Sequence, residues 1–97
     1  MFHILFSPSA SDDIGWFSRR ERRTVFDQTE EQLRHQPATE TRNRKRLRPN
    51  QVAEWELRIG EYRVFYDVET ESDTVEVKMV GRREHNRLLV RGKEYVL

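Results

Sequence analysis

One segment decides the fold: Trp55-Glu56-Leu57-Arg58-Ile59-Gly60-Glu61-Tyr62-Arg63-Val64-Phe65-Tyr66-Asp67-Val68. Hydrophobic residues alternate with other side chains on both sides of Gly60-Glu61, which predicts two strands joined by a two-residue turn. Glycine at the first central position tolerates the positive φ of a type II′ turn. The alternation assigns one face to the core, formed by Trp55, Leu57, Ile59, Tyr62, Val64, Tyr66 and Val68. The outward face then carries Glu56, Arg58, Arg63, Phe65 and Asp67.

The chain ahead of this hairpin predicts one strand and two helices. Residues 2–6 alternate as a strand, and Ser7-Pro8 suits the start of a short helix. We expect that helix to place Ala10, Ile14 and Phe17 on one face and to break near Ser18. A second helix is expected over residues 19–36, ended by Pro37, with a buried stripe of Val25, Phe26, Thr29 and Leu33.

The remaining segments complete an α+β domain. Residues 37–53 lack periodicity and fit a loop, a short strand or a turn of helix. In a strand over 75–80, Val75, Val77 and Met79 should alternate with Glu76, Lys78 and Val80 and so share one face. Residues 88–97 form a small hairpin or an edge segment. We therefore expect a single domain over residues 1–97, in which an N-terminal strand and a helical hairpin precede a three-stranded antiparallel meander with a short C-terminal extension. The helices would cover one sheet face and leave the other open and polar. The place of the first strand stays open.

Composition limits the class of protein. The 97 residues are 35% hydrophobic and 36% charged, which allows only a small core beneath a heavily ionised surface. The chain has no cysteine, which excludes disulfides and thiol chemistry. Neither a signal-peptide pattern nor an apolar run near eighteen residues occurs, so we expect a soluble, cytoplasmic protein with no membrane contact.

Basic residues are unevenly distributed behind a net charge of +1. Fifteen of the eighteen are arginine, and they cluster at residues 19–23, 42–48 and 82–83. Arginine favours planar, bidentate recognition of phosphate or carboxylate groups. The clusters indicate an anionic partner, either nucleic acid, an acidic protein or both. The alternative is a solvated surface in which these residues pair with the seventeen acidic ones.

Candidate catalytic groups are few. His3, His35 and His85 lack ligand-type spacing, so we expect no metal and no cofactor. His85 follows a strand end beside Arg82-Arg83-Glu84, where imidazole can act as a general acid or base or simply be solvated. Four isolated glycines exclude a nucleotide-binding fingerprint.

The outward face of the hairpin allows two interpretations. Glu54, Glu56 and Arg58 share that face, and Arg63 should lie beside them. The side chains either form ion pairs that keep the sheet soluble, or the arginines hold a phosphodiester while a carboxylate or His85 moves protons. The two flanking basic runs favour the second interpretation.

Three motifs resemble the toxins of the RelE/ParE superfamily of type II toxin–antitoxin systems, with closer similarity to the RelE branch. They are Arg46-Leu47-Arg48-Pro49, the Trp55–Val68 hairpin, and Val80-Gly81-Arg82-Arg83-Glu84-His85-Asn86. The resemblance implies a RelE-like microbial RNase fold and a cognate antitoxin as partner. RelE-branch toxins are ribosome-dependent endoribonucleases that cut mRNA in the decoding site, whereas the ParE branch poisons DNA gyrase.

The resemblance also implies roles for individual residues. Arg63 matches the hairpin arginine that contacts the scissile phosphate, and Arg83 matches the second arginine after the Val-Gly step. The lysines of RelE-like toxins fall on Glu54 and Glu56, and their C-terminal tyrosine falls near Leu89. Another base is therefore expected, either His85 or Glu56.

Together these observations predict a toxin that cleaves mRNA on the ribosome without a metal. Its RNA contacts would be Arg44, Lys45, Arg46, Arg48, Arg58 and Arg82. The resemblance implies that its antitoxin is a small, acidic and partly disordered protein that forms a hetero-oligomer with it. The alternatives are a gyrase inhibitor that acts by binding without catalysis, and a basic interaction module with no toxicity.

Overall fold

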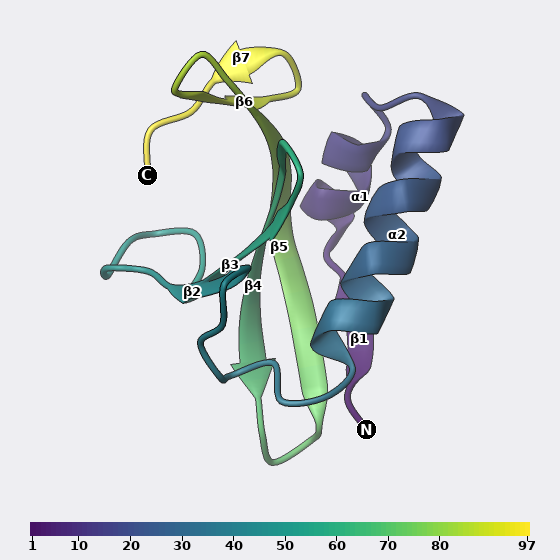
Figure 1. Ribbon diagram of the computed structural model, residues 1–97, viewed down its shortest axis with the longest axis vertical. Coiled ribbons are helices and arrows are strands. Elements are labelled where there is room, and N and C mark those ends of the chain that lie inside the picture. Colours follow the sequence, from purple (N-terminus) through teal and green to yellow (C-terminus); the bar gives the residue numbers. More distant parts are fainter.

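A computed structural model describes residues 1–97 as two helices packed on a strongly twisted sheet (Figure 1). The elements follow in the order β1 (His3–Phe6), α1 (Pro8–Ile14), α2 (Arg19–Leu33), β2 (Arg44–Arg46), β3 (Trp55–Ile59), β4 (Tyr62–Glu69), β5 (Thr74–Glu84), β6 (Arg87–Val90) and β7 (Lys93–Glu94). The predicted α+β class and the central meander β3-β4-β5 are confirmed.

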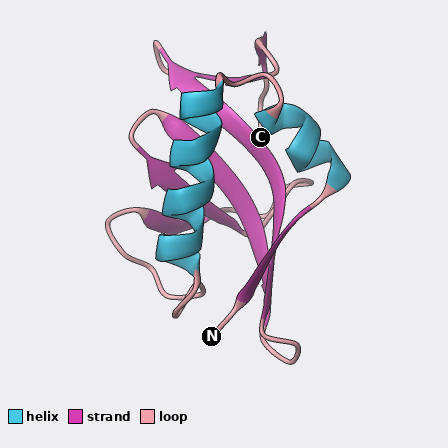
Figure 2. Cartoon of the chain, turned by 90° about the vertical axis from the view of Figure 1, so that its right-hand side faces the viewer, coloured by secondary structure: helices cyan, strands magenta, loops and turns pink.

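The sheet has the order β2-β3-β4-β5-β6-β7, with antiparallel neighbours throughout. β1 pairs in parallel with the first half of β5, from His3 opposite Thr74 to Phe6 opposite Val77. This pairing fixes the position that the sequence left open. Both helices cover the same face of the sheet (Figures 1 and 2).

The helix starts agree with the sequence, but the helix ends do not: α1 ends at Ile14, before Phe17 and the break expected near Ser18. Ser7 caps α1 by accepting a hydrogen bond from the backbone N–H of Ala10 at 3.1 Å. Ser18 and Glu21 form a capping box at the start of α2. α2 ends at Leu33 instead of the expected Gln36, and Gln36 itself adopts a left-handed φ of 52° that no α-helix accommodates. Neither helix is long and apolar enough to cross a membrane.

The main core lies between the helices and the sheet. Trp55, Leu57, Val64 and Tyr66 are buried there, as the hairpin alternation predicted, and Gly60 has the expected positive φ of 58°. Ile59, Tyr62 and Val68 pack against the same core. The prediction for Phe26 was wrong: this residue is 41% exposed, and its ring packs edge-on against Phe6 at the margin of the core.

A β-bulge changes the alternation of β5. Phe65 of β4 pairs with Met79, whereas the next residue, Tyr66, pairs with Val77, which leaves Lys78 as an extra residue. Val80 therefore joins Val77 in the main core, and Met79 turns to the opposite face. The prediction that Met79 shares a face with Val75 and Val77 was wrong for this reason.

The face opposite the helices is only partly open. Ala53, Phe65, Met79 and Leu88 form a second core there, covered by Leu47, Val52 and Val90. Phe65, predicted to point outward, is fully buried because the segment between β2 and β3 and the strand β6 pack over it. The expected open, polar face is therefore found only beyond this second core.

Candidate functional site

Three arginines from successive strands of the meander meet on the sheet face opposite the helices. Arg58 of β3 lies directly opposite Arg63 of β4, and Arg63 lies opposite Gly81 of β5. Arg83 is two residues beyond Gly81, so its side chain projects from the same face, diagonally across from Arg63. We call Arg58, Arg63 and Arg83 the arginine cluster.

The Arg63 guanidinium is held by the turn of the hairpin. Its Nη1 group donates to the carbonyl oxygens of Gly60 at 2.7 Å and of Tyr62 at 2.9 Å. Burial lowers the pKa of Arg63; the carboxylate of Glu56 raises it, and the charges of Arg58 and Arg83 lower it further. Arg63 remains a cation. Its Nε and Nη2 groups have no acceptor within the protein, which leaves one edge of the guanidinium free for an anion.

Glu56 lies beside the arginine cluster and is only 7% exposed. Its Oε1 atom accepts a hydrogen bond from Arg58 Nε at 3.0 Å. Arg63 and Arg83, in contrast, have no carboxylate within 4.0 Å. One negative charge therefore faces three positive charges, and the site carries an excess of positive charge that suits a phosphodiester.

His85 occupies the tip of the β5–β6 turn. His85 and Asn86 both adopt positive φ angles, 49° and 64°, and the imidazole is exposed and makes no hydrogen bond within the protein. It lies two residues beyond Arg83, at the end of the sheet that carries the arginine cluster. No group of three or more His, Asp or Glu side chains is arranged to hold a metal ion.

Leu89 does not share the face of the arginine cluster. It pairs with Arg82 across β5 and β6 and lines a hollow with Trp16 and Phe17 on the side of the helices. The position where the sequence comparison places the tyrosine of RelE-like toxins is thus turned away from Arg63.

Two predicted RNA contacts are used inside the fold instead. Arg44 is buried and donates to the carbonyl oxygens of Gln32 at 2.6 Å and Thr39 at 3.1 Å, which fixes the chain between α2 and β2. Arg82 points toward the helices, forms an ion pair with Glu21 and stacks on aromatic rings, those of Phe17 and Tyr62. Neither guanidinium belongs to the arginine cluster.

The other predicted RNA contacts lie on β2 and the segment that follows it. Arg46 is exposed, forms an ion pair with Glu54 at 3.4 Å and stacks on Trp55 at 5.6 Å. Lys45 lies opposite Glu56, and Lys45 and Arg48 have no carboxylate within 4.0 Å. Lys45 thereby adds a fourth cation next to the arginine cluster.

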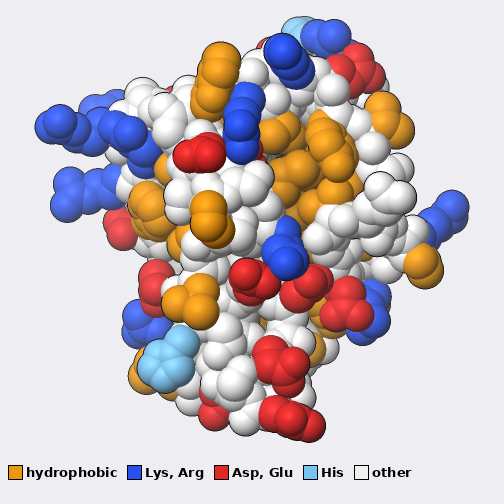
Figure 3. Space-filling view, turned by 180° about the vertical axis from the view of Figure 1, so that it is seen from behind, with side chains coloured by type: hydrophobic (Ala, Val, Ile, Leu, Met, Phe, Trp, Pro, Cys, Tyr) orange, Lys and Arg blue, Asp and Glu red, His pale blue; other side chains and the backbone are white.

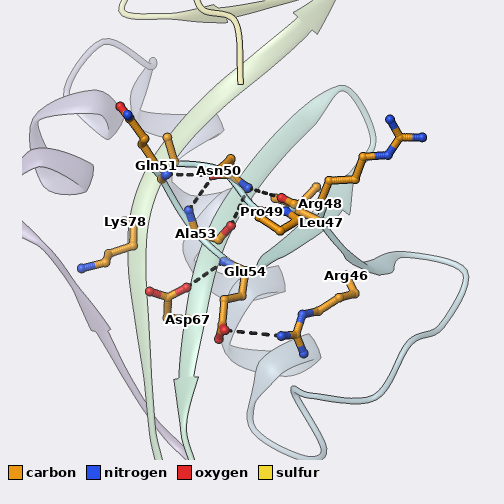
Figure 4. A pocket seen from close by; sticks show the side chains of 11 residues that line it. Arg46, Leu47, Arg48, Pro49, Asn50, Gln51, Ala53, Glu54, Asp67 and Lys78 are labelled. Carbon is orange, nitrogen blue, oxygen red and sulfur yellow. Dashed lines mark hydrogen bonds and ion pairs between the residues drawn. The ribbon is translucent and has the colours of Figure 1, made fainter.

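A groove of about 560 Å³ lies beside this segment (Figure 4). Asn50 shapes its wall, because its side chain accepts from the N–H groups of Val52 and Ala53 and donates to the carbonyl oxygens of Arg48 and Ala53. Lys78, the bulge residue, lines the far side. Pro49-Asn50 indicated a turn here, but no signal in the sequence marked Lys78 as a groove residue.

Acidic side chains occupy the open half of the same sheet face. Glu54, Asp67, Glu69 and Glu76 line a shallow hollow of about 620 Å³. In the view from behind, acidic side chains gather over the lower half of the molecule, whereas hydrophobic and basic ones gather over the upper half (Figure 3). A polyanion is therefore attracted to the arginine cluster and repelled from the far end of the sheet.

The structure is similar to solved toxins. The RelBE2 toxin–antitoxin complex from Mycobacterium tuberculosis contains a chain 26% identical in sequence, with a TM-score of 0.74 over 84% of this chain and 91% of that one. The isolated RelE toxin from E. coli is 21% identical, with a TM-score of 0.69 over 88% of this chain and 87% of that one. The archaeal RelE–RelB complex from Pyrococcus horikoshii is 14% identical, with a TM-score of 0.68 over 87% and 97%. The last two similarities concern the fold alone.

Comparison of the sequence with curated proteins found no match. A family model described as "ParE toxin of type II toxin-antitoxin system, parDE" matches residues 4–87. That match spans most of the chain, from β1 through the arginine cluster and the β5–β6 turn. The chain therefore belongs to the ParE toxin family, within the RelE/ParE superfamily of type II toxin–antitoxin toxins.

Proposed function

We propose that this toxin is a ribosome-dependent, metal-independent mRNA endoribonuclease. The observation that carries the proposal is the pair Arg63 and Arg83, two cations without carboxylate partners that project from neighbouring strands on one face. Arg63 also presents a free guanidinium edge beside a turn that holds it in place. Preorganised cations of this kind stabilise charge that develops on a phosphate.

In the proposed reaction the 2′-hydroxyl of the RNA attacks the adjacent phosphorus atom. A bond forms between the 2′-oxygen and phosphorus, the bond to the 5′-oxygen breaks, and the products are a 2′,3′-cyclic phosphate and a 5′-hydroxyl. Arg63 and Arg83 stabilise the negative charge on the phosphate oxygens. One proton leaves the 2′-hydroxyl and one reaches the departing 5′-oxygen.

His85 and Glu56 are the candidates for moving these protons. Glu56 is buried against Arg58, a position suited to orienting the arginine cluster. His85 is exposed, and an imidazole can both accept and donate a proton, so we assign proton transfer to it. His85→Gln should remove one limb of the pH–rate profile, whereas Glu56→Gln should lower the rate without changing the profile's shape. If the Glu56 variant loses the limb instead, the two roles are reversed.

The ribosome supplies the RNA in the proposed mechanism. Lys45 lies next to the arginine cluster, whereas Arg46 and Arg48 follow it along the chain and line the groove beside β2. All three would bind ribosomal RNA backbone. This contact should weaken steeply with salt, because each neutralised phosphate releases counterions.

The test is cleavage of mRNA on purified ribosomes by the wild type and by Arg63→Ala and Arg83→Ala variants. Each variant should lose on the order of 10²–10³-fold in rate, because each removes one charge-stabilising group. Arg34→Ala is the matched control, since Arg34 is an exposed arginine that forms only an ion pair with Glu30 within α2. Full cleavage by both cluster variants would reject the proposed site.

A second candidate function is inhibition of DNA gyrase by binding without catalysis. The family match to ParE toxins favours it, as does the presence of Glu54, Glu56 and Leu89 where RelE-like toxins carry lysines and tyrosine. Intact mRNA on ribosomes, together with inhibited supercoiling by purified gyrase, would establish this function in place of the first.

The proposed partner in the cell is an antitoxin, as in the complexes from M. tuberculosis and P. horikoshii. An acidic segment of that antitoxin would neutralise the arginine cluster and so block access to RNA. Co-expression with the small open reading frame next to the toxin gene tests this: it should abolish toxicity and yield a toxin–antitoxin hetero-oligomer.

A further inference from the structure

A second surface, away from the arginine cluster, combines exposed aromatic rings with unpaired cations. Trp16, in the turn between α1 and α2, is 66% exposed, and Tyr95, just after β7, is 40% exposed. Both side chains line one hollow of about 510 Å³, together with Val90, Arg91, Lys93 and Glu94. None of these residues belongs to the arginine cluster or to the groove beside β2.

The indole of Trp16 lies against the turn formed by residues 91 and 92. A Cβ added at Gly92 would be in ordinary van der Waals contact with its six-membered ring, at 3.7 Å. Gly92 follows Arg91 in a turn in which both residues have positive φ, 76° and 54°. Arg91 is itself fixed, because its Nε donates to the buried carboxylate of Asp13 at 2.7 Å. One part of the ring is thus supported by the turn while the rest faces solvent.

Among the charged residues that line the hollow, Arg91 pairs with Asp13 and Glu94 pairs with Arg87, which leaves Lys93 as the unpaired cation. Lys93 has no carboxylate within 4.0 Å, and neither do Arg19, Arg20, Arg22 and Arg23 at the start of α2. These four arginines begin three residues after Trp16. The proposed cleavage reaction does not use any of them.

We propose that the hollow between Trp16 and Tyr95 binds an unpaired base of single-stranded RNA, with Lys93 and the arginines of α2 on its phosphates. Single-stranded RNA sites combine aromatic stacking faces with a cationic track, and both are present here. The volume lies within the range of small-ligand sites, which are mainly apolar with a few polar groups. The inference rests on the proposed function and adds an RNA contact outside the cleavage site.

An acidic peptide is the competing occupant, and fluorescence separates the two. The protein has two tryptophans, and Trp55 is 4% exposed, so quenching by an added ligand reports on Trp16. A short single-stranded RNA oligonucleotide should quench this emission in a salt-dependent manner. Quenching by a poly-glutamate peptide but not by RNA would overturn the proposal.

Substitution measures the stacking contribution. Binding is measured by fluorescence anisotropy with labelled RNA. Trp16→Leu should bind the RNA about 5- to 150-fold more weakly, which is the range expected for the loss of one base stack. Trp16→Phe should retain most of the affinity because it keeps an aromatic ring. Phe26→Leu is the matched control, because Phe26 is an exposed aromatic residue on α2 that does not line the hollow. Equal binding by the Trp16→Leu variant, or an equal loss in the Phe26→Leu variant, would overturn the proposal. Unchanged thermal melting shows that the variants are folded.

Two further measurements keep this proposal separate from the cleavage site. Arg63→Ala should slow cleavage by the roughly 10²–10³-fold expected above but leave quenching of Trp16 intact. A failure of the proposed enzyme and a failure of this site therefore give different results. Co-sedimentation with empty ribosomes identifies the source of the base. If Trp16→Leu weakens co-sedimentation with empty ribosomes, the bound base belongs to ribosomal RNA. If it weakens binding of the oligonucleotide alone, the base belongs to messenger RNA. If it weakens neither, the proposed site is rejected.

Discussion

The contact between Glu21 and the end of β5 is expected to make an acid-sensitive contribution to stability. Glu21 Oε1 accepts the backbone N–H of Ser18 at 2.8 Å, completing the capping box of α2. Its Oε2 accepts the hydroxyl of Tyr62 at 3.1 Å and forms an ion pair with Arg82. These interactions, led by the Ser18 N–H, hold the pKa of Glu21 below its ordinary value of 4.5 although burial raises it.

The size of the effect follows from these partners. A helix cap contributes about 1 kcal/mol, one hydrogen bond about 1 kcal/mol, and a partly exposed ion pair about 0.2–1 kcal/mol. Glu21→Ala should therefore lower the free energy of unfolding by about 2 kcal/mol at pH 7, and Tm by about 10 °C. Glu21→Gln retains the cap and the bond to Tyr62 but loses the charge, so we expect a loss of no more than about 1 kcal/mol.

The pH dependence identifies the charge as the cause. The pKa of Glu21 is lower in the folded than in the unfolded protein, so its stabilisation is complete above the unfolded value of 4.5 and is lost as pH falls through the folded value. Thermal melts followed by circular dichroism should show a gap in Tm between wild type and Glu21→Gln at pH 7 that narrows as the pH falls below 4.5 and Glu21 becomes protonated in the folded protein. Glu31→Gln, an exposed glutamate of α2 with no ion pair, is the control. A gap that does not narrow below pH 4.5, or an equal gap in the control, would refute the reasoning.

Three further predictions concern the sheet. Tyr66→Phe leaves the Pro37 carbonyl oxygen without its 2.8 Å hydrogen bond, so chemical denaturation should show a free energy of unfolding about 1–2 kcal/mol lower. Burial raises the pKa of Tyr66 in the folded protein, so the tyrosine of the unfolded chain ionises first. Wild-type stability should therefore fall above about pH 10. Gly81→Ala would bring a Cβ to 2.8 Å from the Leu89 carbonyl oxygen, so we expect a Tm at least about 5 °C lower. An unchanged Tm would show that β6 can move away from the added methyl group without loss of stability. Deletion of Lys78 removes the bulge residue and should abolish the cooperative melting transition. The control Lys78→Ala should shift Tm by about 2 °C or less. A cooperative melt of the deletion variant near the wild-type Tm would show that the bulge is dispensable.

Local patterns in the sequence were sufficient for the hairpin and the helix starts. The face of each residue in the hairpin depends on alternation and on a turn in which only Gly60 needs a positive φ. The capping box depends on Ser18 and Glu21, three residues apart. Both features are decided by neighbours in the chain, which is why the sequence alone predicts them.

The second core and the internal arginines could not be predicted in the same way. Phe65 is buried by Leu88, which is 23 residues further along the chain, and Arg82 finds Glu21 61 residues away. A charged residue in a basic run is normally expected in solvent, so nothing local marks Arg44 or Arg82 as part of the interior. Their positions depend on tertiary contacts that bring distant acceptors and aromatic rings to them.

The bulge decides which of two adjacent arginines reaches the candidate site. If Val75 and Val77 began an unbroken alternation along β5, Arg83 would face the helices and Arg82 would lie beside Arg63. The extra residue reverses this order, so Arg82 packs on the helix side and Arg83 projects beside Arg63. Unbroken alternation would thus have turned Arg83 away from Arg63, although the resemblance to RelE-like toxins implies that both arginines act on the same phosphate. The register shift at the bulge brings both side chains to one face. The arginine cluster is consequently a product of the bulge as much as of the arginines themselves.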